Sequence, residues 1–326
     1  MRVLLTTTSY QDTPGKHHEV LAASGFDVVR ARGPLSEAQM LDLVKGEGFD
    51  GLLNGDDLIT AKVIDTCLPR LKVIAKYGIG LDSIDVKYAT TKKIPVLFTP
   101  GVNHTTVAEH TFGLMIALAK HFWPHLNSTK HGEWKRITGT ELFGKKIAVL
   151  GVGRVGKEVI KRARAFEMEC VGFDKFWDED FAHQYGVERG ATIEGAVKTA
   201  DVISLHMNLD DSNRGFVNAA FISNLKKGAI IINTARGGLV NEADIAAACK
   251  SVKQGGTGQL GGYGTDVLEH EPQKPGHPFT EIDNIIVTPH VGSRTFESVE
   301  RQAMRATLNI VNYLRGDKDY IQANQF

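Results

Sequence analysis

Three side chains in the C-terminal half of the chain could together bind and protonate a small organic acid. Arg236 follows an apolar run, and the planar fork of a guanidinium suits two-point contact with a carboxylate. His290 also follows an apolar run, and an imidazole can give and take a proton near neutral pH. A carboxylate of the acidic stretch 266–272, which includes Glu269 and Glu271, could stabilise the protonated imidazole. Each has a plainer alternative, because such an arginine can serve a structural salt bridge and such a histidine is often simply packed.

A glycine-containing stretch nearer the N-terminus could hold the acid group of the same ligand. It consists of Tyr77, Gly78, Ile79 and Gly80, directly after an apolar run. Consecutive backbone amides around two glycines form a concave donor surface that suits a carboxylate. An ordinary surface loop is the alternative that these residues alone leave open.

Residues 146–174 contain, in order, the features that a dinucleotide site requires. A short apolar run leads into Gly151, Gly153 and Gly156, a helical segment follows, and a second apolar run ends at Asp174. Asp174 lies eighteen positions after Gly156 and can accept both hydroxyls of an adenosine ribose. A carboxylate here would repel a 2′-phosphate, so the sequence favours NAD over NADP.

Each glycine of this stretch has a distinct physical task. Gly151 permits the tight turn out of the strand, Gly153 lets the backbone approach a pyrophosphate, and Gly156 lets the helix pack close to the strand. The amides that open the helix, around Arg154 and Val155, then face the phosphates at the positive end of the helix dipole.

Composition narrows the class of protein. The 326 residues suffice for two domains, and the hydrophobic fraction of 42% is ordinary for a globular protein. Lys and Arg together number 38, as do Asp and Glu, so no charge excess points to nucleic acid or to an anionic membrane. The three cysteines are scattered in apolar or helical contexts, which predicts reduced core thiols in a cytoplasmic protein. No leader or membrane-spanning stretch is expected.

Short apolar runs alternate with helical segments along the whole chain, which is the pattern of βαβ units and parallel sheets. The expected division places residues 1–103 and 296–326 in one domain and residues 104–295 in a second. The last helix, near 295–314, is expected to return to the first sheet, leaving a ligand cleft between the domains.

Two local expectations concern the second domain. A long helix is expected over residues 105–122, ended by Trp123-Pro124 and followed by a second helical piece to about Trp134. Six of the sixteen residues 249–264 are glycine, which predicts a flexible surface excursion before a strand at 263–268. The placement of Asp266 depends on that strand.

Taken together, these motifs resemble the D-isomer-specific 2-hydroxyacid dehydrogenase family, and the likeness covers nearly the whole chain. The residues that carry it are 77–82, 107–110, 151–156 with Asp174, 234–238, 266–272 and Pro289-His290. The resemblance implies an α/β protein of two doubly wound parallel-sheet domains. A Rossmann-type NAD domain would be inserted into a discontinuous, flavodoxin-like substrate domain.

The resemblance also implies roles for individual residues. Arg236 would bind the substrate carboxylate and polarise its 2-oxo group, His290 would be the acid–base, and Glu271 would hydrogen-bond His290. The amides of Gly78, Ile79 and Gly80, with Tyr77 beside them, would bind the substrate carboxylate. NAD, the implied cofactor, would contact Val107, Gly151, Gly153, Arg154, Val155, Gly156, Asp174, His206, Asn208, Thr234, Ala235, Arg236, Asp266, His290 and Gly292. Asn208 departs from the family, in which proline is usual.

The partners implied are a small 2-hydroxy or 2-oxo acid and a second copy of the chain. The segment from Thr105 to Leu142 resembles the arm through which the family dimerises. No metal is expected, although His121 and His125 stand four apart, because Pro124 lies between them and a third ligand is not evident. His104 could also contact substrate.

Two other functions remain open. A nucleotide-sensing interaction protein, similar to the transcriptional co-repressors that resemble this family, would bind NADH without turnover. Formate or phosphite oxidation is the second, and Glu271 argues against the formate branch, whose members carry glutamine there.

Overall fold

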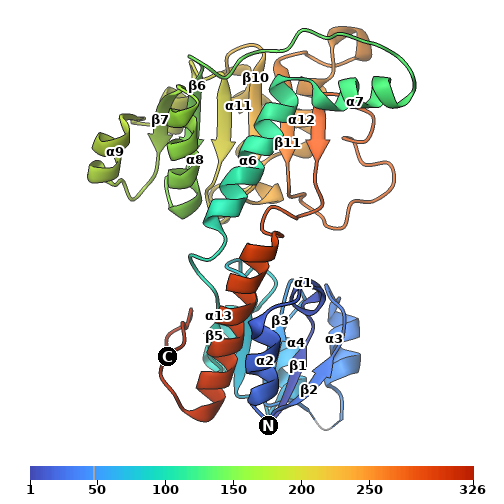
Figure 1. The fold of residues 1–326 in the computed structure, drawn as a ribbon, viewed down its shortest axis with the longest axis vertical. Helices are drawn as coiled ribbons and strands as arrows, with labels where there is room; N and C mark the ends of the chain where they lie inside the picture. The colour runs from blue at the N-terminus through green and yellow to red at the C-terminus, as the bar shows by residue number, and fades with distance from the viewer. Residues whose placement is uncertain (47) are drawn as a thin grey trace. The chain divides into compact units, whose positions relative to one another are not determined.

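The computed structural model describes residues 1–46 and 48–326. The chain forms two compact units, residues 1–103 with 294–326 and residues 104–293 (Figure 1). The return to unit 1 occurs two residues earlier than the sequence suggested. The reason is local: Thr295 already caps the final helix, accepting a hydrogen bond from the Ser298 amide, and that helix packs in unit 1.

Unit 1 is built on one five-stranded parallel sheet in the order β2-β1-β3-β4-β5, the flavodoxin-like arrangement. Its strands are β1 Arg2–Leu5, β2 Asp27–Arg30, β3 Gly51–Asn54, β4 Val73–Lys76 and β5 Val96–Leu97. Its helices are α1 Thr8–Asp12, α2 Lys16–Ala23, α3 Glu37–Val44, α4 Ala61–Cys67, α5 Val86–Thr91 and α13 Phe296–Arg315.

Both faces of this sheet are apolar because successive side chains of a strand point to opposite sides. In β1, Val3 and Leu5 join the core under α2 and α13, whereas Leu4 joins the core under α3 and α4. Ser36 caps α3 in a capping box with Gln39, which accounts for the sharp start of that helix.

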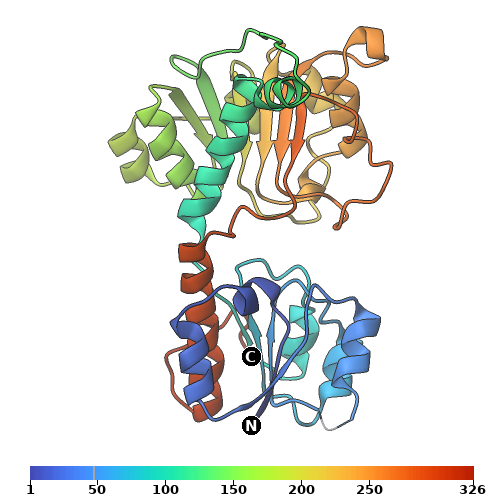
Figure 2. The same ribbon diagram turned by 45° about the vertical axis from the view of Figure 1, so that its right-hand side comes forward.

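Unit 2 is built on a seven-stranded parallel sheet in the order β12-β11-β10-β9-β6-β7-β8, whose strands run side by side in Figure 2. Its strands are β6 Lys146–Leu150, β7 Glu169–Phe173, β8 Val187–Arg189, β9 Val202–Leu205, β10 Ala229–Asn233, β11 Leu260–Thr265 and β12 Ile285–Val287. Its helices are α6 His104–Ala119, α7 Phe122–Lys130, α8 Arg154–Ala165, α9 Glu179–Tyr185, α10 Ile193–Val197, α11 Ala219–Ser223 and α12 Glu242–Cys249, with short 3-10 turns η1 Gly237–Leu239 and η2 Val252–Gln254.

The strand expected at 263–268 is wrong by three residues, because β11 begins at Leu260 inside the glycine-rich stretch. These glycines bring α6 close to the sheet rather than loosening the chain. A Cβ at Gly262 or Gly264 would lie 3.0–3.2 Å from side chains of Leu118 or Leu114 on α6. Asp266 therefore follows the end of β11 directly.

The helix expected over 105–122 is also corrected. α6 ends at Ala119, and Trp123-Pro124 lies in the first turn of α7 rather than ending the preceding helix. Proline is tolerated there because the amides of the first helical turn have no partner within the helix.

Apart from these two segments, the predicted architecture is confirmed: both sheets are parallel, both are doubly wound, and unit 2 is inserted into a discontinuous unit 1. Strand β8 and helices α9 and α10 were not foreseen. Among the described residues, no helix has the length and apolarity required to cross a membrane.

Replacing a core residue of α13 should destabilise unit 1. The Ile310 side chain is fully buried. It packs so close to β3 that a Cβ added to Gly51 would lie 2.9 Å from it, so Ile310→Ala would leave a cavity there. We expect a loss of about 2–5 kcal/mol in the free energy of unfolding, measured by urea denaturation followed by circular dichroism. Glu300→Ala, at an exposed position of the same helix, is the control, and equal losses in the two variants would contradict the packing described.

Candidate active site

The turn between β6 and α8 has the shape that a dinucleotide phosphate requires. Gly151 has φ +97°, and a Cβ there would lie 2.6 Å from the His206 backbone. A Cβ at Gly156 would lie 2.0 Å from the Gly151 carbonyl oxygen, so only glycine permits this packing. At Gly153, by contrast, an added Cβ would meet nothing within 4 Å. The backbone there borders open space.

The helix that follows this turn presents unsatisfied donors to that space. Gly153 is the N-cap of α8 and offers no side-chain hydrogen bond, so the first amides, including those of Arg154 and Val155, have no intrahelical acceptor. Asp174, just past β7, accepts from the Val152 amide at 2.7 Å and the Phe176 amide at 2.8 Å. Its carboxylate is thereby placed beside the turn. The donor set and the open cradle fit an NAD pyrophosphate and ribose.

His206 and Asn208 follow β9 on the same side of the sheet. The His206 amide donates to the Leu150 carbonyl at 2.7 Å, and its ring Nε2 lies 2.7 Å from the Ser204 hydroxyl. Burial lowers the pKa of His206 to about 3, so the ring is neutral at ordinary pH. Asn208 is exposed, and its carbonyl accepts from the Asn213 side chain. The departure from proline at 208 thus falls on a surface loop.

Thr234, after β10, is tied to α6. Its hydroxyl lies 2.9 Å from that of Thr111, which donates to the Val107 carbonyl. The two expected cofactor contacts Val107 and Thr234 are thus joined through one threonine. His104 opens α6, and its Nδ1 is buried with no hydrogen-bond partner among the residues described.

The loop that carries Arg236 is held by the buried Asn233 side chain. Asn233 Nδ2 donates to the Arg236 carbonyl at 2.9 Å, and its Oδ1 accepts from the Ala235 amide at 3.1 Å. The guanidinium Nη1 donates to the Ala235 carbonyl at 2.7 Å, so the side chain lies back along its own loop.

A close backbone approach connects this loop to the one that carries Glu271. A Cβ at Gly237 would lie 2.0 Å from the Leu268 carbonyl carbon, so no other residue fits without moving the backbone. The Leu268 amide in turn donates to Glu271 Oε1 at 3.0 Å. Arg236 and Glu271 are therefore mounted on touching loops.

Glu271 and His290 are in direct contact. Glu271 Oε2 lies 2.8 Å from His290 Nδ1, and both side chains are partly open to solvent, 37% and 45% exposed. An ionised carboxylate only accepts hydrogen bonds, so Nδ1 carries the proton of this contact and Nε2 is directed to other partners. His290 has φ +53°, in the left-handed region that few residues other than glycine adopt.

Asp266 holds the backbone around His290. Its Oδ1 accepts from the Thr288 hydroxyl at 2.6 Å and the Val291 amide at 2.9 Å, and its Oδ2 accepts from the Gly292 amide at 2.7 Å. Burial opposes ionisation, but hydrogen bonds from His110, Thr288 and these two amides together hold the pKa of Asp266 below its usual value. The carboxylate therefore stays charged and keeps the His290 segment in place.

His110 is a contributor for which sequence reasoning assigned no role. Its Nε2 lies 2.8 Å from the Thr288 hydroxyl and 3.4 Å from Asp266 Oδ1. Because Thr288 gives its only proton to Asp266, His110 must be the donor in that contact. The signal was present in the sequence, since His110 belongs to the motif 107–110, but nothing in the motif indicated its partner.

In unit 1 the expected anion cradle follows β4. The Tyr77 amide donates to the Asn54 carbonyl, and the Gly78 amide donates to the Thr99 hydroxyl at 3.0 Å. The Gly78 amide therefore has an acceptor within the chain, and its binding to a substrate carboxylate stays a prediction. Ile79 and Gly80 have amides that donate to no acceptor within the described part of the chain.

The parallel sheets explain why these residues gather where they do. In unit 2, the expected residues follow the carboxyl ends of β6, β7, β9, β10, β11 and β12, which lie at one edge of the sheet. Ligands of open α/β sheets bind outside that edge. The stretch 77–80 stands at the corresponding end of β4 in unit 1.

Comparisons with known proteins agree with this arrangement. Residues 112–292 match the family model described as D-isomer specific 2-hydroxyacid dehydrogenase, NAD binding domain. The D-3-phosphoglycerate dehydrogenase of Methanocaldococcus jannaschii is 38% identical over 285 residues, covering 87% of this chain and 53% of that protein. The glyoxylate reductase of Korarchaeum cryptofilum is 31% identical over 299 residues, covering 90% of this chain and 87% of that protein.

A solved structure shows the same likeness. D-lactate dehydrogenase from Aquifex aeolicus, complexed with NAD and lactic acid, superposes with a TM-score of 0.82 at 26% identity, covering 97% of this chain and 96% of that one. The chain spans about half the length of the archaeal phosphoglycerate dehydrogenases it matches, 53% and 55% of two of them. This chain belongs to the D-isomer specific 2-hydroxyacid dehydrogenase family, and it carries that family's NAD-binding domain.

Proposed function

We propose that this protein is an NAD-dependent oxidoreductase that interconverts a small D-2-hydroxy acid and the corresponding 2-oxo acid. The observation that carries the proposal is the 2.8 Å hydrogen bond between Glu271 and His290. The loop of Glu271 also touches the loop of Arg236, at Leu268 and Gly237. An acid–base pair beside a guanidinium suits proton transfer to a substrate held by its carboxylate.

The cofactor end of the site is proposed to use the turn 151–156 and Asp174. The open space at Gly153, the free amides of α8 and the carboxylate of Asp174 support that assignment. When bound, NADH supplies the hydride that reduces the 2-oxo carbon, and NAD accepts it in the reverse direction. Oδ2 of Asp266 accepts from the Gly292 amide at 2.7 Å, and its second lone pair suits an amide donor of the nicotinamide.

His290 is proposed to transfer the proton. In reduction, Nε2–H would give a proton to the carbonyl oxygen as the new C–H bond forms, and in oxidation Nε2 would take the hydroxyl proton. Glu271 keeps Nδ1 protonated and fixes the ring. Arg236 is proposed to bind the substrate carboxylate, and the amides of Ile79 and Gly80 would be further donors to it.

The substrate is proposed to be a small 2-oxo acid in the size range of glyoxylate, hydroxypyruvate and lactate or pyruvate. By their names, the glyoxylate reductase and the D-lactate dehydrogenase described above act on acids of this class, and the match covers 87% of the glyoxylate reductase. A panel of 2-oxo acids with NADH, followed at the nicotinamide absorbance band, tests the proposal. Tight binding of NADH without turnover on any acid would instead favour a nucleotide-sensing protein.

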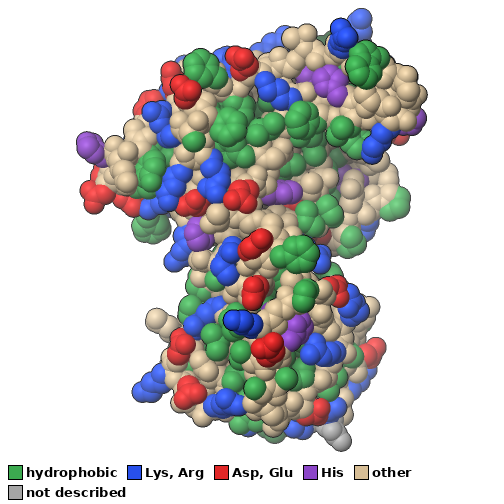
Figure 3. Space-filling model, viewed as in Figure 1, with side chains coloured by type: hydrophobic (Ala, Val, Ile, Leu, Met, Phe, Trp, Pro, Cys, Tyr) green, Lys and Arg blue, Asp and Glu red, His purple; other side chains and the backbone are tan. Residues whose placement is uncertain are grey.

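A homodimer is also proposed, formed through the arm between Thr105 and Leu142. Figure 3 shows apolar side chains gathered on the face of unit 2 that carries α6 and α7. The large exposed apolar side chains of this region are Phe122, Trp123, Leu126, Trp134, Ile137 and Phe143. Such a cluster is typical of a surface covered by another chain.

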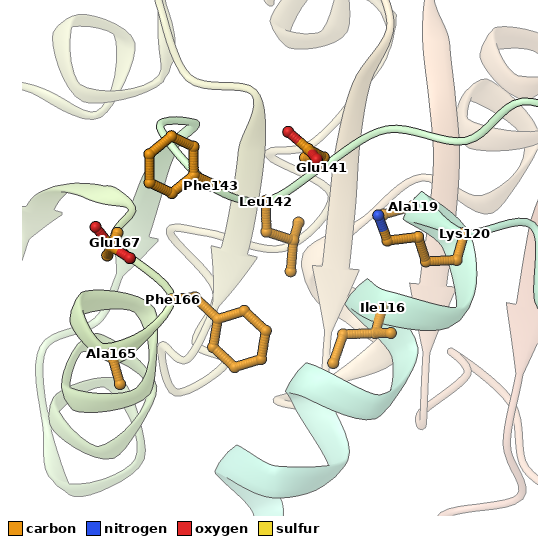
Figure 4. A pocket seen from close by; sticks show the side chains of 9 residues that line it. All are labelled: Ile116, Ala119, Lys120, Glu141, Leu142, Phe143, Ala165, Phe166 and Glu167. Carbon is orange, nitrogen blue, oxygen red and sulfur yellow. The ribbon is translucent and has the colours of Figure 1, made fainter.

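A groove beside the arm adds to that surface. Figure 4 shows it between the C-terminal ends of α6 and α8, lined by apolar groups of Ile116, Leu142, Phe143 and Phe166. A second copy would cover both the groove and the exposed aromatic groups. A cytoplasmic location is likewise proposed, supported by the three cysteines, all buried and unpaired.

Removing the acid–base should abolish turnover without disturbing the cofactor. We expect His290→Ala to lower kcat by about 10²–10⁴-fold, because the proton then lacks a positioned donor. NADH affinity, measured by fluorescence titration, should be unchanged. His183→Ala removes an exposed histidine on α9 and serves as the control. Retained turnover in His290→Ala would refute the assigned role.

Removing the carboxylate after β7 should relax the cofactor preference. We expect Asp174→Ser to weaken NADH binding about 10- to 100-fold, the loss of one or two charge-assisted hydrogen bonds to ribose, and to improve NADPH binding relative to wild type. Dissociation constants for both cofactors measure this. Asp180→Ser, at an exposed position of α9, should leave both constants unchanged. A wild-type preference for NADPH would contradict the role of Asp174.

Placing a charge in the exposed cluster should separate the two copies. We expect the wild type to be a dimer and Trp123→Asp to be a monomer by sedimentation equilibrium, because an unpaired carboxylate in an apolar interface is costly. Val252→Asp changes an apolar residue outside the arm that is exposed even more than Trp123, and this variant should remain dimeric. A monomeric wild type would contradict the proposal.

A further inference from the structure

We propose that Glu242 is a positioning residue for Glu271, because its single carboxylate holds both ends of the exposed segment in which Glu271 lies. The proposal rests on the function proposed above for Glu271 and His290. It concerns a residue that touches neither of them directly and that follows a different strand.

The two contacts of Glu242 reach residues that flank Glu271 on either side. Glu242 is the first residue of α12, and its Oε1 accepts from the Glu269 amide at 2.9 Å. Its Oε2 lies 3.1 Å from Nε2 of His277. The Glu242 and His277 side chains are only 15% and 12% exposed, so this contact is shielded from competing water.

The segment between these contacts has little else to hold it. Residues 269–276 are all exposed. Besides the bonds to Glu242, the segment is held by the Leu268 amide to Glu271, by Glu271 to His290, by the His277 amide to the Lys274 carbonyl, and by an exposed 3.9 Å ion pair between Glu269 and Arg214. An exposed segment with few contacts opens at low free-energy cost unless its ends are fixed. Glu242 fixes both.

The position of the ring proton on His277 explains why residue 242 must be a carboxylate rather than an amide. The Phe279 amide donates to His277 Nδ1 at 3.3 Å, so Nδ1 is an acceptor and the ring proton is on Nε2. Glu242 therefore receives one donor on each oxygen. A glutamine could accept only one of them, because its amide nitrogen would face the other donor.

A chain of contacts also connects His277 to the loop that carries Arg236. The His277 ring packs against Phe279 at 4.8 Å between centroids, and Phe279 packs against Tyr263 at 5.5 Å. The Tyr263 hydroxyl lies 3.4 Å from Asn233 Nδ2, which also donates to the Arg236 carbonyl. We call the contacts of Glu242 with Glu269 and His277 the clamp. The clamp and the loop of Arg236 are thus both connected to the buried Asn233 side chain.

Hydrogen exchange tests the clamp without requiring activity. In Glu242→Ala we expect the amides of residues 266–281 to exchange at least tenfold faster, while those of β6 and α8 are unchanged. In Glu281→Ala, which removes an exposed carboxylate beyond the clamp, exchange should match the wild type. Unaltered exchange in Glu242→Ala, or in His277→Ala if the first variant does not fold, would overturn the clamp.

Kinetics then test whether the clamp acts through Glu271. We expect Glu242→Ala to lower kcat about tenfold or more with the NADH dissociation constant unchanged, and Glu242→Gln to be intermediate. In a Glu271→Gln background the same change should cost nothing further, because the residue it positions is already lost. Full additivity would overturn the positioning role. Failure of the wild type to turn over any 2-oxo acid would refute the proposed function, while the exchange result would still decide the clamp.

Discussion

The parallel direction of every strand in unit 2 is the constraint on which the rest of the site depends. Because all seven strands point the same way, the segments after β6, β7, β9, β10, β11 and β12 emerge at one edge, although they are spread over more than a hundred residues. The parallel sheet alone therefore brings four features to the same edge: the glycine turn 151–156, Asp174, Arg236 and His290. The order of the strands decides which of them become neighbours.

Three carboxylates at this edge are used in physically different ways. Asp266 is buried and receives short hydrogen bonds from one hydroxyl and two amides, so it serves as a fixed support for the backbone around His290. Glu271 is partly exposed and accepts the hydrogen bond from Nδ1 at the edge of the His290 ring. Glu242 is shielded and accepts from both ends of the segment that carries Glu271.

Glycine also has opposite effects at different places in this chain. At Gly237 and Gly156 the missing side chain permits a backbone approach that no other residue allows, and the contact makes the turn rigid. In β11 the glycines let α6 lie against the sheet. A composition that suggested a flexible excursion therefore belongs in part to the most tightly packed region of unit 2. Local composition could not distinguish these cases, because the partner atoms belong to distant segments.

The sequence by itself determined the alternation of strands and helices, the discontinuous first unit, the cofactor fingerprint and the candidate acid–base residues. Those features follow from periodicity and from side-chain chemistry at short spacing. Only the tertiary structure decided that the Gly78 amide is occupied, that His110 supports Asp266, and that Glu242 bridges Glu269 and His277. These contacts join residues separated by 21 to 178 positions, and such contacts are set by how packed elements approach one another in space. The spacing of residues along the chain does not predict these long-range contacts.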